Sequence, residues 1–191
     1  MATETKLRQL ADKGCPVYYF YSSERYLVRQ AVTAITRILT ADSDEDATVL
    51  DGAAPEIEQL IMAAGTISFF GTRRVVVLPE IDPAAYSDKD LEELNSTLSS
   101  LENAVVVLGS VFELERSKLK TGKRAQKLIA QCKALGYTEE LAKPKPFELK
   151  MMMIDRAKEQ KTTLPDGAAA ALLERCGEDP FLLEKDRNTS E

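Results

Sequence analysis

Two adjacent phenylalanines, Phe69 and Phe70, are the residues best placed to act on another molecule. They stand in the stretch 68–74, where a helical pattern ends and before the strand-like run 75–78. Adjacent residues of a helix point about 100° apart, so one buried stripe seldom takes both rings. Each phenylalanine ring that stays exposed to water lacks about 1.5–3 kcal/mol of the stabilising free energy that its burial would give. Two interpretations follow. Both side chains are buried at the edge of the domain's own core, or both are exposed and bind a partner.

The residue types of this chain give little support for a catalytic site. The chain has no histidine, which removes Ser-His-Asp and Cys-His catalysis and histidine-containing zinc sites. Cys15, Cys132 and Cys176 are far apart, without metal-ligand spacing and without an implied disulfide framework. We therefore expect no catalytic residue and no metal, and a reduced cytoplasmic compartment.

A phosphate cradle is missing where a parallel α/β domain would carry one. Such a cradle needs glycines whose N–H groups surround the phosphates, and a lysine that reaches them. The turn after the expected strand 17–21 is Ser22-Ser23-Glu24-Arg25, in which Glu24 would repel a phosphate. Thr121-Gly122-Lys123 resembles the end of a phosphate loop but lacks its upstream glycine. The sequence thus predicts no nucleotide cofactor.

Charged clusters allow two interpretations each. Glu80 and Asp82 follow the third expected strand, where metal-binding acids often sit, but without a cradle they indicate a solvated strand end. The basic segment 118–133 predicts a helix with a solvated face, and a protein or nucleic-acid contact is the alternative. Because the net charge is −6, a free-standing, charge-driven nucleic-acid binder is disfavoured. Residues 151–153, three methionines, are expected to fill a core.

The elements that must position these residues alternate between strands and helices. The strands are continuous apolar runs, which is typical of a parallel sheet covered on both faces. With right-handed crossovers this predicts a three-layer α/β domain. Strands are expected at 17–21, 47–50, 75–78 and 104–108. Helices are expected at 3–13, 24–40, 91–101 and 118–133. A further core helix is expected to begin at Pro55 and to be marked by Ile57, Leu60, Ile61 and Ala64.

A composition shift at 141–146, with two prolines and two lysines, predicts a linker. Two helical patterns follow, at 147–160 and 165–176, and a third helix is expected to begin at 179. We expect domains at 1–143 and 144–191. The N-terminus lacks the apolar core of a signal peptide, and the longest apolar runs are too short to span a membrane.

Several stretches together resemble the delta subunit of the bacterial DNA polymerase III clamp loader. They are 17–27, 49–52 and 68–78, and the segments 115–119 and 154–158 fit the same family. The order and spacing of these stretches carry the resemblance, rather than any one motif.

The resemblance implies an AAA+-like domain at 1–143 that binds a clamp and has lost its phosphate-binding loop. It implies a small helical, lid-type domain at 144–191 that is incomplete, and a third, collar-forming domain that this sequence does not include. The last seven residues, 185–191, depart from the family pattern, as an artificial or frameshifted end would.

The resemblance also implies a function. In the family, an apolar pair at a helix tip enters a pocket on the sliding clamp and helps to open it. That pair maps onto Phe69 and Phe70, with the edge of the contact shaped by the flanking residues Ser68, Gly71, Thr72, Arg73 and Arg74. The subunit would be non-catalytic and without cofactor, part of a DNA-directed DNA polymerase holoenzyme. Its partners would be the sliding clamp, the gamma/tau and delta prime subunits, and primer–template DNA.

Three other functions stay open from the residues. One is an AAA+ ATPase with a degenerate cradle, and another is a small Rossmann-like transferase with a concave site at the strand ends. The third is single-stranded DNA binding through the basic segment 118–133, which a steep salt dependence would reveal.

Overall fold

The computed structural model describes residues 4–41, 43, 45–65, 73–142, 146–159 and 162–176. The chain divides into two compact units, Met1–Ala142 and Lys143–Glu191. In the second unit the described elements are two helices, α6 (Pro146–Glu159) and α7 (Asp166–Cys176). The first unit contains the sheet and the segments that flank the predicted site.

A five-stranded sheet with the order β2-β3-β4-β1-β7 forms the centre of the first unit. All of its described pairings are parallel, as the sequence predicts. The edge strand β7 was not expected, because its residues Tyr-Thr-Glu-Glu form no apolar run. The strands are β1 (Val17–Ser22), β2 (Thr48–Val49), β3 (Arg74–Leu78), β4 (Ala104–Val111) and β7 (Tyr137–Glu140).

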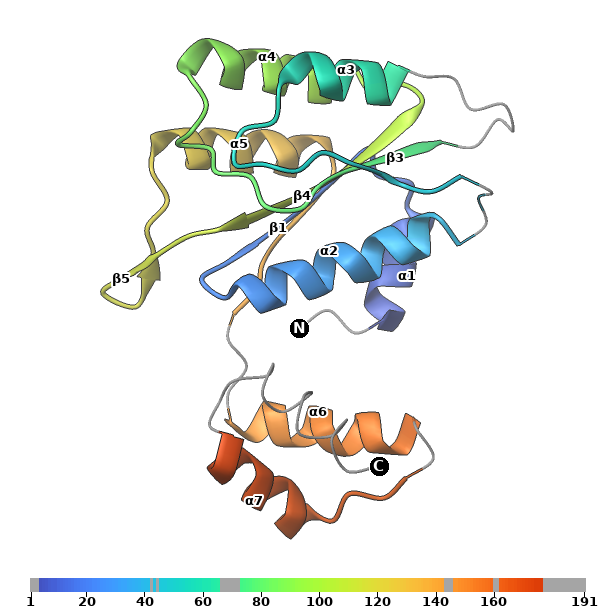
Figure 1. Ribbon diagram of the computed structural model, residues 1–191, viewed down its shortest axis with the longest axis vertical. Coiled ribbons are helices and arrows are strands. Elements are labelled where there is room, and N and C mark those ends of the chain that lie inside the picture. The colour runs from blue at the N-terminus through green and yellow to red at the C-terminus, as the bar shows by residue number, and fades with distance from the viewer. Residues whose placement is uncertain are drawn as a thin grey trace. The chain divides into compact units, whose positions relative to one another are not determined.

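Helices cover both faces of this sheet (Figure 1). On one face α1 (Glu4–Asp12) and α2 (Arg25–Leu39) pack on one apolar cluster. On the other, α3 (Ile57–Gly65), α4 (Asp88–Ser99) and α5 (Lys123–Leu135) pack on a second cluster. Side chains alternate across a strand, so Tyr18 enters the first cluster and Tyr19 the second. The three-layer α/β prediction is confirmed.

Helical periodicity explains which face of each helix is buried. In α2 the side chains of Leu27, Val28, Ala31 and Ile35 are buried at the expected spacing. The start of α4 is capped by Ser87, whose hydroxyl oxygen accepts a hydrogen bond from the Asp90 N–H at 3.1 Å. Burial of an apolar stripe thus holds α2 on the sheet, and the cap defines where α4 begins.

Expectations about three segments are wrong. The basic segment 118–133 is not one helix, because β5 (Leu114–Glu115) and β6 (Lys118–Leu119) form an antiparallel hairpin before α5 begins at Lys123. The helix α3 begins at Ile57 rather than at Pro55, and Ile61 is 46% exposed instead of belonging to the core. Met151 is likewise exposed rather than core-filling.

Within the described residues, no helix combines the length and the apolar character needed to cross a membrane.

Candidate functional site

The predicted contact segment 68–72, which contains Phe69 and Phe70, lies outside the described residues. The elements before and after it are described. The helix α3 ends at Gly65, and β3 begins at Arg74. In the chain the phenylalanine pair therefore belongs to the connection between a core helix and a core strand.

Arg73 and Arg74, the two described members of the predicted site, both contact groups of this chain. The Nη1 atom of Arg73 donates a 2.8 Å hydrogen bond to the carbonyl of Gly14, which closes the turn after α1 at a φ of 64°. The Nε atom of Arg74 lies 3.3 Å from Oε2 of Glu45, an ion-pair contact in which Nε itself makes no hydrogen bond. Both contacts fix the start of β3, and a further contact with a partner stays a prediction.

Apolar side chains on α3 form a surface next to the predicted segment in sequence. Ile57 and Leu60 are buried and attach the helix to the core, whereas Ile61 and Met62 are 46% and 65% exposed. Sequence reasoning missed Met62 and assigned Ile61 to the core. The signal was present, because three consecutive apolar residues, 60–62, cannot all lie on one helical stripe.

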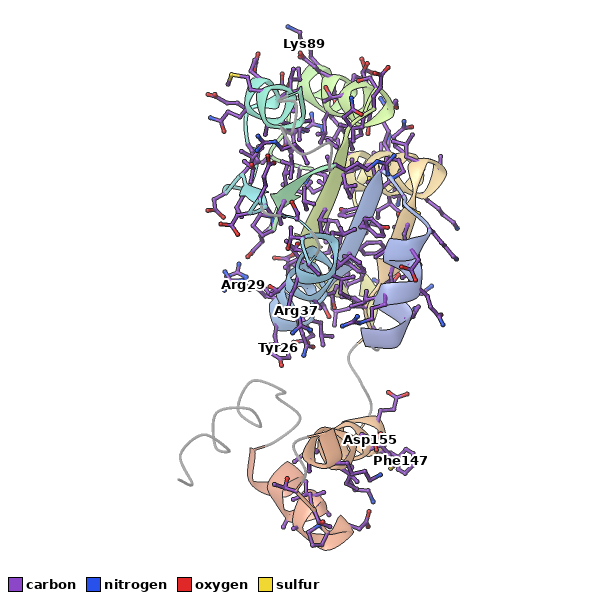
Figure 2. The ribbon with its side chains drawn as sticks, turned by 90° about the vertical axis from the view of Figure 1, so that its right-hand side faces the viewer. Tyr26, Arg29, Arg37, Lys89, Phe147 and Asp155 are labelled. Carbon is purple, nitrogen blue, oxygen red and sulfur yellow. The ribbon has the colours of Figure 1, made fainter. Side chains whose placement is uncertain are left out.

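The place of a phosphate cradle is occupied by an ion-paired cluster. Arg25 and Arg29 lie on the first two turns of α2, just after β1. The carboxylate of Glu80, which follows β3, lies 2.6 Å from Arg25 Nη2 and 3.6 Å from Arg29 Nη2. Figure 2 shows Arg29 on the outer surface of α2. Glu80 is thus not the solvated strand end that the sequence predicted.

A cavity of about 300 Å³ adjoins this cluster and carries opposed charges. It is lined by the charged residues Arg29, Asp51 and Glu80, together with residues 52, 53 and 79. Two carboxylates beside one guanidinium repel a polyphosphate more than they attract it. Asp82 is exposed, and its Oδ1 accepts a 2.9 Å hydrogen bond from the Ala84 N–H, so its carboxylate closes a turn.

Buried hydroxyls at this edge of the sheet are used internally. Ser22 Oγ donates to the Leu141 carbonyl at 2.6 Å. The Tyr19 hydroxyl donates to Ser110 Oγ at 2.8 Å, and Ser110 in turn donates to the Ile81 carbonyl at 2.8 Å. Burial, chiefly, raises the pKa of Tyr19 above its ordinary value, so the phenol stays neutral. These groups stabilise the fold and offer no activated nucleophile.

Metal binding has no support in the part of the chain that the structure describes. There, no group of three or more histidine, cysteine, aspartate or glutamate side chains could hold an ion. Of the acids after β3, Glu80 is used in ion pairs and Asp82 in a turn contact.

The parallel sheet, its two helical layers and the ion-paired turn define the class: an AAA+-like α/β domain without a phosphate cradle. Solved structures support this fold. The Bacillus subtilis DNA clamp loader delta protein, YqeN, matches with a TM-score of 0.66 and 22% identity over 98% of this chain and 56% of that chain. Domain III of the Thermotoga maritima replication initiation protein DnaA matches with a TM-score of 0.56 and 12% identity, over 98% of this chain and 85% of that chain.

A variant of Thermotoga maritima RuvB gives a TM-score of 0.54 and 13% identity, over 95% of this chain and 58% of that chain. The present chain spans little more than half the length of the clamp loader delta protein that it matches. Comparison with curated proteins found no match. The family described as DNA polymerase III, delta subunit, matches residues 18–135, more than half of the 191 residues. The chain belongs to this family.

Proposed function

We propose that this chain is a clamp-loader delta subunit that binds the sliding clamp and opens it. Phe69 and Phe70 would enter an apolar pocket of the clamp, with Ser68, Gly71, Thr72, Arg73 and Arg74 at the edge of the contact. The family match over residues 18–135 carries the proposal, because this range includes the adjacent phenylalanines.

The anchoring of the flanking elements supports this role. Ile57 and Leu60 attach α3 to the core, and Arg73 and Arg74 fix the start of β3. Flanking elements that are already fixed in the free subunit do not have to be ordered when it binds. Two aromatic anchors that lose their water together, surrounded by a polar rim, have the composition of an interface hot spot.

Opening the clamp requires that the subunit bind the open form more tightly than the closed form. No catalysis by this chain is needed for that, and ATP would be bound by other subunits. The gamma/tau subunits are proposed partners. The other proposed partners are the delta prime subunit and primer–template DNA. The ion-paired cluster of Glu80 with Arg25 and Arg29 supports a subunit that leaves nucleotide binding to its neighbours.

The test compares two double variants for binding to the cognate sliding clamp by surface plasmon resonance. The first is Phe69→Ala with Phe70→Ala. The matched control is Phe147→Ala with Met151→Ala, which removes two exposed apolar side chains from α6. We expect the first variant to lose at least about 30-fold in affinity, because one hot-spot residue contributes about 2 kcal/mol or more. The control should bind like the unchanged chain.

Circular dichroism of both variants establishes that the fold is retained. A Phe69/Phe70 variant that is folded and still binds the clamp with unchanged affinity would contradict the proposal. Equal losses in both variants would show that general apolar exposure, rather than the phenylalanine pair, drives the contact.

A further inference from the structure

The β5–β6 hairpin and the start of α5 concentrate positive charge on a chain that is negative overall. Residues 113–123 hold four cations against two carboxylates, whereas the whole chain has a net charge of −6. All four cations are exposed. We refer to them as the basic hairpin patch: Arg116, Lys118, Lys120 and Lys123.

Arg124 and Lys127 of α5 are paired with carboxylates, whereas three of the four patch cations have no ion pair among the described residues. Arg124 Nε lies 2.7 Å from Asp88 Oδ1, and Lys127 Nζ lies 3.0 Å from Glu92 Oε1, so α4 supplies both carboxylates. Within the described ranges, the patch has one ion-pair contact, between Lys120 and Glu113 at 3.9 Å. Its remaining cations therefore keep their charge available to another molecule.

The hairpin places Arg116 at an exposed tip against its own backbone preference. Arg116 and Ser117 have φ values of 51° and 62°, in the left-handed region that asparagine and glycine adopt most easily. A non-glycine residue in this region carries a conformational cost. Figure 1 shows the hairpin beyond the end of β4, away from the body of the sheet. The backbone at the tip therefore leaves the long cationic side chain of Arg116 exposed to solvent.

The other cations continue from the tip to the start of α5. Lys118 pairs with Glu115 in the hairpin register. A cavity of about 230 Å³ nearby is lined by Phe112, by the cations Lys120, Lys123 and Arg124, and by one carboxylate, Asp82. Phe112 is 8% exposed, so it offers no free face for stacking. The surface thus provides point charges for anionic groups without an aromatic platform for bases.

We propose that the basic hairpin patch binds the phosphodiester backbone of DNA independently of base sequence. Lysine ammonium groups act as flexible point charges for phosphates, and sequence would be read only through contacts with base edges. The choice of DNA over an acidic polypeptide rests on the proposed function. Binding by the patch alone releases few counterions, so it is weak and sensitive to salt.

The test measures fluorescence anisotropy of a labelled duplex of mixed sequence, with the 191-residue chain and no clamp, over a series of salt concentrations. The patch variant is Lys118→Gln, Lys120→Gln and Lys123→Gln. The matched control is Lys13→Gln, Lys89→Gln and Lys133→Gln, which removes three exposed positive charges elsewhere in the first unit.

We expect the slope of log K against log salt to become shallower by about 2–3 in the patch variant, since each lost phosphate contact contributes about 0.9. The control should keep the slope of the unchanged chain. Equal losses in both variants, or no binding by the unchanged chain at low salt, would overturn the proposal. So would binding to polyglutamate that matches DNA in affinity and depends on the same lysines.

Because the clamp is absent from this assay, its result does not depend on Phe69 and Phe70. If the chain binds the clamp but not DNA, only the proposal that the basic hairpin patch binds DNA is overturned. A chain that binds DNA through the patch but fails to bind the clamp would contradict the proposed function alone.

Discussion

At the scale of single residues, Glu80 decides what the carboxyl edge of the sheet can bind. Its carboxylate contacts both Arg25 and Arg29, so the two cations nearest to the end of β1 are already paired. The adjoining turn 22–24 also provides no glycine, and Ser22 Oγ accepts the Glu24 N–H at 3.1 Å. A phosphate would meet neither free cations nor a ring of amide donors there.

We therefore predict that the chain does not bind Mg-ATP saturably at millimolar concentrations, measured by equilibrium dialysis with labelled nucleotide. The Glu80→Gln variant should behave likewise, because freeing Arg25 and Arg29 does not create a glycine-rich cradle. Saturable binding by the unchanged chain would favour the ATPase alternative. Binding by the Glu80→Gln variant alone would show that the ion pairs, and not the missing cradle, exclude the nucleotide.

At the scale of elements, β4 packs so closely on its neighbours that Gly109 has no room for a side chain. A Cβ atom there would overlap the Pro79 carbonyl oxygen and lie 2.8 Å from Val28 Cγ1. The strand is thereby pressed against both the segment after β3 and the helix α2. This close approach brings Glu80 near Arg25 and Arg29.

The Gly109→Ala variant should accordingly lose about 3 kcal/mol in free energy of unfolding, since the clash involves backbone that cannot move aside. Gly65→Ala is the matched control, because a Cβ atom at that helical position has no neighbour within 4 Å. Alanine there should leave stability unchanged or raise it by up to about 1 kcal/mol. Urea denaturation followed by circular dichroism measures both, and equal stabilities would contradict the packing account.

Elements with strong local patterns could be predicted from the sequence, and those that depend on tertiary neighbours could not. The continuous apolar runs of β1 and β4 identified both strands, and alternation with helices gave the parallel sheet. The edge strand β7 was missed because Tyr137–Glu140 is polar, and a strand there is stabilised by pairing with β1. The hairpin was missed because its lysines read as part of a basic helix.

The same limit applies to the site. The pairing of Glu80 with Arg25 could not be read from the chain, since it requires knowing that β4 alone lies between β1 and β3. The missing phosphate cradle, by contrast, is a local property and was evident from residues 22–25. The role of Phe69 and Phe70 stays a prediction that clamp binding must test.

At the scale of the whole molecule, the first unit contains a complete core. Its two apolar clusters lie on opposite faces of the sheet, and together they draw on side chains from Leu7 to Leu141. None of the described members of these clusters comes from the second unit, Lys143–Glu191. Burial of this kind is what allows a domain to fold by itself.

We predict that residues 1–142 fold alone and bind the clamp as the full chain does. All six tyrosines lie in this range, so tyrosine near-UV circular dichroism reports on the same unit in both proteins. The urea midpoint of that signal should agree between the fragment and the full chain, because the same apolar surface is buried in each. A fragment without near-UV signal, or with a much lower midpoint, would show that the second unit supports the first. A folded fragment that no longer binds the clamp would instead place part of the clamp contact beyond residue 142.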